Sequence, residues 1–543
     1  MKKIRNFALV VGLVVTAGIL AACGNQTSKN GSNKQSISLM QTSDLTSLDN
    51  TNQATMPEFN TLTNISEGLY RLNDKDQPVP AMATKIVKPS DNGKKYIFHI
   101  RKSAKWSNGD TVKAVDFEYS WKRSLNPANN PVYTYVFSGI KNADAIINHK
   151  KSYKTLGIRA TGEKTLEITL DHPMAYFNKL VAMPVFMPQD KSFVEKVGIK
   201  QYGTNAKNTV SNGAFKITDW TGTSDSYRLV KNPYYWDKKA IKLDQINYKT
   251  VKDSNTAHNL FEDKKLDDAT ISGVTAKSLQ KNKNLKSVPK AWTYYLQVNQ
   301  RKGQPLANQK LRQAISLAIN RKELTNKVLA DGSLPASGFV SPGTAIDPTT
   351  GKDFSRETSF SVAQNTAQAR KLFNAGKKEA GISGTVNLSI VGDDQDVTKN
   401  VAQYLQGQLD KTLPGVKVNI SNIPDKAQQA RRSEGKFDLA QWYWLADFGD
   451  PINYLGILTT NNTMNPGKFS DRTYDNLIQK AKTADNQADY WQALRQAEKR
   501  LMSRTGIIPL YYVRESHLVN PKLHGVEYHV AGFADYTRAS ITK

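Results

Sequence analysis

The chain has 543 residues but a single cysteine, Cys23, so no disulfide can form within it. It also lacks the short motifs that mark many enzymes. There is no Gly-x-Ser-x-Gly turn, no Gly-rich phosphate loop, no Gly-x-Gly-x-x-Gly and no His-Glu-x-x-His. Because a catalytic triad need not be local in sequence, these absences lower the expectation of an enzyme without removing it. We therefore expect a non-enzyme with no cofactor, and a cell-wall enzyme remains the less favoured alternative.

The seven histidines are scattered and do not form a convincing metal site. His524, Glu527 and His529 come nearest to a cluster of ligands, but in a chain of this length their proximity in sequence is typical of chance. No metal ion is therefore expected.

Acidic residues are in the minority: the chain has 48 Asp and Glu against 75 Lys and Arg, which gives a net charge of +27. No dense Lys/Arg run with interleaved aromatic residues occurs, which argues against nucleic-acid binding. A basic surface instead fits weak attraction to anionic lipids and cell-wall polymers. An adhesin that uses this surface remains an alternative.

No hydrophobic run is long enough to span a bilayer, and the longest lies at the N-terminus. Lys2, Lys3 and Arg5 precede 16 uncharged residues at 7–22, which is the pattern of a secretory signal peptide. Leu20-Ala21-Ala22-Cys23 resembles a bacterial lipobox, which implies cleavage before Cys23 and its diacylation. The alternative is a plain secretory signal. Residues 23–36, rich in Gly, Ser and Asn, are expected to be a flexible tether.

The rest of the chain mixes predicted strands and helices, which favours α/β lobes over one barrel. Alternating apolar residues predict strands at 96–100 and 166–170. Asn308 is a plausible N-cap for a helix with a buried stripe from Leu311 to Ile319. The apolar spacing from Tyr490 to Leu501 predicts a late helix before a strand at 507–513.

Four segments together resemble the large, peptide-type solute-binding proteins of ABC importers, in particular the oligopeptide-binding branch. They are Tyr96-x-Phe98-x-Ile100-Arg101 through Ser120-Trp121, Asn212-Gly213-Ala214-Phe215 with Lys231-Asn232-Pro233-Tyr234-Tyr235-Trp236, Tyr294-Tyr295-Leu296 through Ala318-Ile319-Asn320-Arg321, and Trp444-Leu445-Ala446-Asp447-Phe448-Gly449-Asp450-Pro451. Each segment alone is a weak signal, but the four occur in the family's order and spacing.

The resemblance implies a two-lobed α/β fold of the periplasmic-binding-protein type (type II), with a hinge and an extra subdomain. We expect a signal peptide at 1–22, a tether at 23–36 and a first-lobe core at 37–75, 180–285 and 505–543. The extra subdomain is expected at 76–179 and the second lobe at 286–504. The implied molecule is a monomeric receptor, anchored through Cys23 to the outer face of the cell membrane. It would capture oligopeptides and deliver them to an ABC permease and its ATPase subunits.

The resemblance assigns Asp447 to the α-ammonium group of a bound peptide, because a positive terminus taken out of water needs a fixed carboxylate. Asp450, directly before Pro451, fits turn capping better. Arg432 is the candidate for the peptide carboxylate, since Gln441 stands where the best-known pattern has Arg. The remaining candidates for the ligand-binding wall are Trp444, Tyr443, Tyr133, Tyr135, Trp292, Tyr294, Tyr295 and Met56.

Three other ligand classes remain open within binding proteins: a dipeptide or signalling peptide, a nickel chelate, and haem. A peptide ligand predicts dependence on a free amino terminus, whereas nickel predicts histidine or chelator contacts in the cleft.

Overall fold

The computed structural model describes residues 35–53, 55–360 and 362–542. One mixed sheet of 11 strands runs through them in the order β14-β13-β15-β11-β16-β10-β1-β9-β8-β7, with β12 paired to β16. Its strands are β1 (Ser36–Gln41), β7 (Phe215–Thr218), β8 (Ser226–Lys231), β9 (Gln245–Thr250), β10 (Asp268–Ile271), β11 (Leu285–Val298), β12 (Leu334–Pro335), β13 (Val386–Gly392), β14 (Val416–Asn422), β15 (Leu439–Leu445) and β16 (Ile507–Val519).

Seven further strands form three small sheets: β4 (Lys95–His99), β5 (Ile158–Gly162) and β6 (Thr165–Thr169); β2 (Tyr70–Leu72) and β3 (Pro78–Pro80); and β17 (Leu523–His524) and β18 (Ser540–Ile541). The α-helices are α1 (Met56–Ile65), α2 (Ala114–Arg123), α3 (Ala143–Ile147), α4 (Phe177–Leu180), α5 (Lys191–Val197), α6 (Ser254–Glu262), α7 (Gly273–Ser278), α8 (Gln309–Ala318), α9 (Arg321–Glu323), α10 (Phe354–Thr358), α11 (Thr366–Glu379), α12 (Asp396–Thr412), α13 (Asp425–Ser433), α14 (Pro451–Leu455), α15 (Arg472–Lys482) and α16 (Gln487–Ser503).

Several predicted elements are confirmed. The strands expected at 96–100 and 166–170 are β4 and β6, which pair antiparallel. Asn308 caps α8, since its side chain accepts a hydrogen bond from the amide of Leu311. The late helix and the strand that follows it are α16 and the first half of β16.

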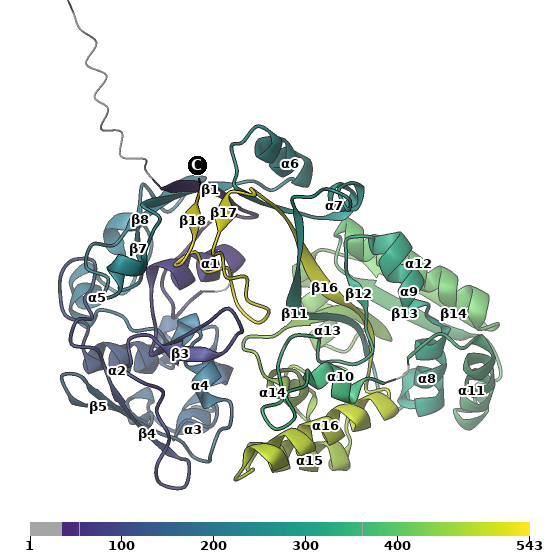
Figure 1. The fold of residues 1–543 in the computed structure, drawn as a ribbon. Coiled ribbons are helices and arrows are strands. Elements are labelled where there is room, and N and C mark those ends of the chain that lie inside the picture. Colours follow the sequence, from purple (N-terminus) through teal and green to yellow (C-terminus); the bar gives the residue numbers. More distant parts are fainter. Residues whose placement is uncertain (1–34, 54, 361, 543) are drawn as a thin grey trace, which may run out of the picture. The chain divides into compact units, whose positions relative to one another are not determined.

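The two long strands β11 and β16 join the two halves of the main sheet (Figure 1). Leu285–Pro289 pairs with the C-terminal half of β16, and Thr293–Gln297 pairs with its N-terminal half. The register shifts between Pro289 and Thr293, where the two ladders meet. Beyond that point β11 also pairs with β15, whereas β16 pairs with β10 on the other side. Two continuous strands therefore connect the two halves of this sheet.

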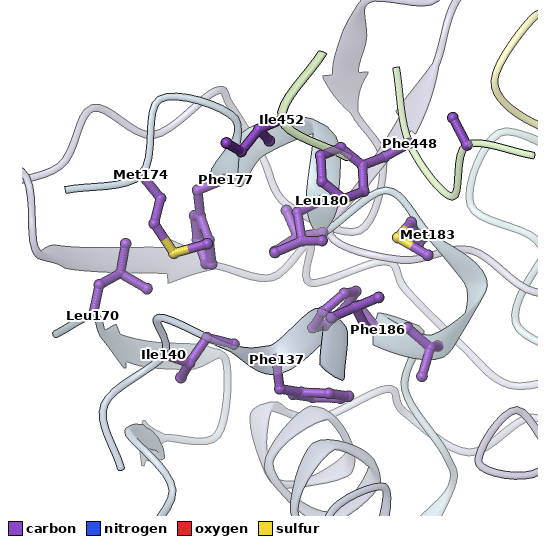
Figure 2. Close-up of a cluster of buried hydrophobic side chains, with 14 of the residues drawn as sticks. Phe137, Ile140, Leu170, Met174, Phe177, Leu180, Met183, Phe186, Phe448 and Ile452 are labelled. Atoms are coloured by element: carbon purple, nitrogen blue, oxygen red, sulfur yellow. The ribbon is translucent and has the colours of Figure 1, made fainter. Parts of the chain in front are cut away.

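A hydrophobic cluster joins the segment around α4 to α14 and the residues before it. Figure 2 shows Phe177 and Leu180 of α4 in this cluster, together with Phe448 and Ile452. Tyr176 stacks on Phe448 with ring centroids 5.4 Å apart. The Lys179 ammonium donates to the Gly449 carbonyl at 2.6 Å. Residues far apart in the chain are thus packed together beside the end of β15.

A buried ion pair ties the chain before α1 to α2. Both terminal nitrogens of Arg123 donate to the Asp49 carboxylate at 2.6 Å, and one also donates to Thr51 and Gln189. Both partners of the pair are almost fully buried. Such a pair fixes geometry, and removing one partner leaves a charge buried without compensation.

We expect Arg123→Gln to lower the free energy of unfolding by roughly 3–5 kcal/mol, because it leaves Asp49 without its counter-ion. Urea denaturation of the purified protein measures this loss. Lys252→Gln is the matched control: it breaks an exposed pair with Asp44, and should cost less than about 1 kcal/mol. Equal losses in the two variants would contradict the structural role of Arg123.

Candidate functional site

An open cavity of about 1190 Å³, here called the cleft, lies between the end of β15, the long strand β11 and the start of α1. Aromatic and apolar side chains dominate its wall. Its lining residues are Met56, Phe59, Tyr133, Tyr135, Met183, Pro184, Lys290, Trp292, Arg432, Trp442, Tyr443, Trp444, Leu445, Ala446, Asp447, Met464, Gly532 and Phe533. An aromatic wall with a few charged groups is typical of a ligand site.

The structure brings most of the predicted site residues to this cleft. Those that line it are Met56, Tyr133, Tyr135, Trp292, Arg432, Tyr443, Trp444 and Asp447. Three others lie elsewhere. Gln441 is buried and donates to the Thr398 carbonyl at 3.1 Å. Tyr294 is stacked between its neighbours, including Tyr511 at 4.8 Å, and Tyr295 is fully buried against Phe339.

Asp447 is held by two neutral hydrogen-bond donors. Its Oδ2 atom accepts from the Tyr135 hydroxyl and from Asn453 Nδ2, both at 3.0 Å. Burial raises the pKa of Asp447 to about 6, although the hydrogen bonds from Asn453 and Tyr135 oppose this rise. No cation among the described residues forms an ion pair with Asp447. The site therefore presents a fixed carboxylate whose charge is not neutralised by the protein.

Asn453 organises this end of the cleft, and sequence analysis did not identify it. Its Oδ1 atom accepts from Trp444 Nε1 at 2.9 Å and from the Asp447 amide at 3.1 Å. It lies on α14, which Asp450 caps by accepting from the Ile452 amide, as predicted for Asp450. Because this cap starts α14 shortly after Asp447, the side chain of Asn453 reaches back to the residues at the end of β15. No sequence motif marks this role.

Arg432, on α13, is the second charged group without an ionic partner in the cleft. Its guanidinium lies over the Trp442 ring, 3.6 Å from the centroid, and Nη1 donates to Gln297 Oε1 at 3.1 Å. Its Nε atom is buried and has no hydrogen-bond partner. No described carboxylate forms an ion pair with it. Burial lowers its pKa, but an arginine remains charged near neutral pH.

The edge of β15 that faces away from β11 is open along most of its length. Among the described residues, β13 pairs with β15 only at Leu439 and Ala440. The amide of Ala446 donates to Ala291 on β11, and backbone groups alternate in an antiparallel ladder. The N–H and C=O groups of Tyr443 and Leu445 therefore point to the open edge. This edge can accept an added extended segment.

A second cavity of about 850 Å³, the inner cavity, shares Asp447 with the cleft. Its wall is more polar and includes Glu67, Arg71, Asp76, His529 and Asp535. Glu67 is buried there and accepts from Tyr235 and Trp236, each at 2.7 Å. Asp447 thus stands where two cavities of different character meet.

Comparison with known proteins agrees with this architecture. Residues 77–466 match the family model described as the middle region of bacterial extracellular solute-binding proteins, family 5. A dipeptide-binding protein of Lactococcus lactis is 33% identical, with 98% of each chain covered. The periplasmic oligopeptide-binding protein OppA of Salmonella typhimurium is 30% identical, over 97% of this chain and 96% of that protein.

Two solved structures show the same fold. OppA of Listeria monocytogenes bound to peptide is 33% identical, with a TM-score of 0.79 over 94% of this chain and all of that one. The pheromone receptor PrgZ is 36% identical, with a TM-score of 0.80 and the same coverage. These structures confirm the predicted two-lobed type II fold. The chain belongs to family 5 of the bacterial extracellular solute-binding proteins.

Proposed function

We propose that this protein is an extracellular oligopeptide receptor that captures peptides in the cleft and delivers them to an ABC permease. The observation that carries the proposal is the pair of charged groups without ionic partners in one cleft, Asp447 and Arg432. A free peptide has an ammonium at one end and a carboxylate at the other. The relatives include peptide-binding proteins and a complex with bound peptide, which supports the same ligand class.

The open edge of β15 supplies the middle of the binding site. A peptide lying along Tyr443 and Leu445 would pair with their backbone groups, as an added strand does. Arg432 lies over Trp442, and Asp447 follows five positions later. At about 3.3 Å per residue that separation is roughly 16 Å, which suits an extended peptide of about four or five residues.

Main-chain recognition of this kind leaves the side chains of the ligand in the cleft, where aromatic walls and water can adapt to them. Tyr443, Tyr135 and Met464 each expose more than a third of their surface there. The cleft is therefore suited to several peptide sequences, and its aromatic wall favours apolar side chains.

Ligand capture would close the two lobes about β11 and β16. Tyr135, from the segment before α3, already donates to Asp447 at the end of β15. A peptide ammonium beside Asp447 would add a charged bond at this junction and favour the closed arrangement. Energy for transport would come from the partner ATPase.

We place the lobes as expected from the sequence: a first-lobe core at 37–75, 180–285 and 505–543, an extra subdomain at 76–179 and a second lobe at 286–504. The signal peptide, the tether and Cys23 lie outside the described residues. No described helix has both the length and the apolar character needed to cross a bilayer. We propose a lipid anchor on Cys23 because two acyl chains give stable attachment to the membrane.

The first prediction concerns the peptide amino terminus. Asp447→Asn should weaken binding of a free pentapeptide by roughly 3–5 kcal/mol, a few hundredfold or more, because the ammonium loses its only carboxylate. Calorimetry with the free peptide and its N-acetylated twin measures this. Acetylation should weaken binding to the native protein and change little in the variant. Asp425→Asn, which alters an exposed carboxylate on α13, is the matched control. Equal affinity of the native protein for both peptides would refute the assignment.

The second prediction concerns the peptide carboxylate. Arg432→Gln should weaken the binding of a free pentapeptide by at least tenfold. C-terminal amidation of the peptide should weaken its binding to the native protein by the same factor. The two changes together should cost little more than either alone, because they remove the same ion pair. Arg431→Gln, on the same helix but bonded to Ser421, should leave affinity unchanged. Additive losses from Arg432→Gln and amidation would show that the carboxylate binds elsewhere.

The third prediction is a pH dependence. Burial raises the pKa of Asp447 to about 6, so the empty protein loses this negative charge as the pH falls through that value. The peptide ammonium stays protonated below about pH 7. Affinity should therefore be nearly constant between pH 6.5 and 7 and fall about tenfold per unit below about pH 6. Neighbouring Tyr133 and Tyr135 do not titrate in this range, because burial raises the pKa of each. The profile of Asp447→Asn should be flat; a native profile equally flat would contradict the assignment.

A further inference from the structure

The hairpin near the C-terminus brings one imidazole and two carboxylates together. Glu527 and Asp535 exchange both backbone hydrogen bonds, at 3.0 and 2.9 Å, across an antiparallel bridge. Side chains of paired residues lie on the same face of a ladder, as do those two positions apart. Glu527, His529 and Asp535 consequently share a face, and their ligand atoms lie within 4.8 Å of one another. Tyr528 lies on the other face and donates to Asp268.

The imidazole of His529 is oriented by a carboxylate from a distant part of the chain. Its Nδ1 atom lies 2.7 Å from Asp76 Oδ1, and the other oxygen of Asp76 accepts from the Val530 amide at 3.1 Å. The His529 side chain is only about 5% exposed, and no described residue bonds its Nε2 atom. A carboxylate on one ring nitrogen and a free second nitrogen is the arrangement of metal-binding histidines.

The carboxylates of this cluster have too few positive partners. Arg71 is the nearby guanidinium: it lies 4.0 Å from Glu67 and attracts Glu527 and Asp535 electrostatically, but forms no ion pair with either of these two. Glu527 Oε2 is buried without any hydrogen-bond partner. The pKa of Glu527 is raised by its burial and by the charge of Asp535, with Asp74 adding to the repulsion and Arg71 and His529 opposing it. These groups together favour an added cation.

We infer that Glu527, His529 and Asp535 bind one divalent transition-metal ion of the zinc class, with Asp76 as the residue that positions His529. Histidine nitrogen and Asp or Glu oxygen are both zinc ligands, and in a site with three protein ligands water fills the fourth position. Hard ions such as Ca²⁺ prefer six or more oxygen ligands, which this cluster does not supply. Zinc binds its ligands at about 2.0–2.2 Å, so small side-chain rotations complete the site.

Sequence analysis considered His524, Glu527 and His529 and attributed their proximity to chance, whereas the structure groups Glu527 and His529 with Asp535. His524 is exposed and lies against Thr542, 3.4 Å from its hydroxyl, whereas Asp535 takes its place in the cluster. Asp535 is eight residues beyond Glu527, and only the pairing of the hairpin brings them together. His524 consequently provides a natural control for histidine content.

The experiment is calorimetric titration of the untagged protein, stripped with a chelator, with zinc chloride. We expect one zinc ion per chain, and binding of calcium and magnesium at least tenfold weaker. Asp535→Asn and His529→Gln should each abolish the stoichiometric site, and Asp76→Asn should weaken it by about 10–100-fold. His524→Gln should bind zinc as the native protein does.

Two further measurements separate a metal site from a purely structural network. Thermal unfolding in the presence of chelator shows whether each variant folds, and a variant that does not fold is replaced by Glu527→Gln. Anomalous scattering from zinc-soaked crystals should place the ion between Glu527, His529 and Asp535. The inference is overturned if no stoichiometric ion binds, if the folded variants retain it, or if the ion lies elsewhere.

Discussion

The proposed function of this protein depends on one carboxylate, Asp447, that is partly buried and has no cation to neutralise it. Two neutral donors, Tyr135 and Asn453, hold it in place. These hydrogen bonds reduce the free-energy cost of burying the charged carboxylate but do not remove it, so the pKa of Asp447 is still raised. A ligand that brings its own positive charge recovers that cost, which is why a peptide amino terminus suits the position better than a neutral group.

The described residues around Asp447 hold its carboxylate in place and leave it without an ionic partner. Asp450 starts α14 one turn later, and α14 returns Asn453 to both Trp444 and Asp447. On the other side, the Lys179 ammonium is engaged by the Gly449 carbonyl and, at 3.7 Å, by Asp450. Lys179, which lines the inner cavity with Asp447, is therefore occupied beside the site and forms no ion pair with Asp447. The cap of α14 and the contacts of Lys179 thus together keep the Asp447 side chain positioned and, within the described part of the chain, without a cation.

The sequence predicted the fold class and many elements because these depend on local patterns. Helix α8 was identified from its apolar spacing and its cap, and Asp450 from its position before Pro451. The aromatic candidates were harder to separate. Trp292 and Tyr294 lie on one face of β11 and Tyr295 on the other, but the sequence does not say which of the two faces is buried, nor which edge of β15 stays unpaired. Asn453 and Phe533 reach the site only through tertiary folding, and no local pattern marks either.

The C-terminal hairpin contacts both the cleft and β11, the latter through Lys290. The ammonium of this buried residue donates to the carbonyls of His529 and Gly532, at 2.9 and 2.8 Å. Gly532 and Phe533 line the cleft, and Phe533 stacks on Phe59 of α1 with centroids 4.8 Å apart. The loop between Glu527 and Asp535 is thus fixed to β11 at one point and to the cleft wall at another. An ion held at the base of this hairpin would restrict the loop further. Because ordering a wall before the ligand arrives lowers the entropy cost of binding, the metal cluster and the peptide cleft would be coupled through the hairpin although they share no ligand.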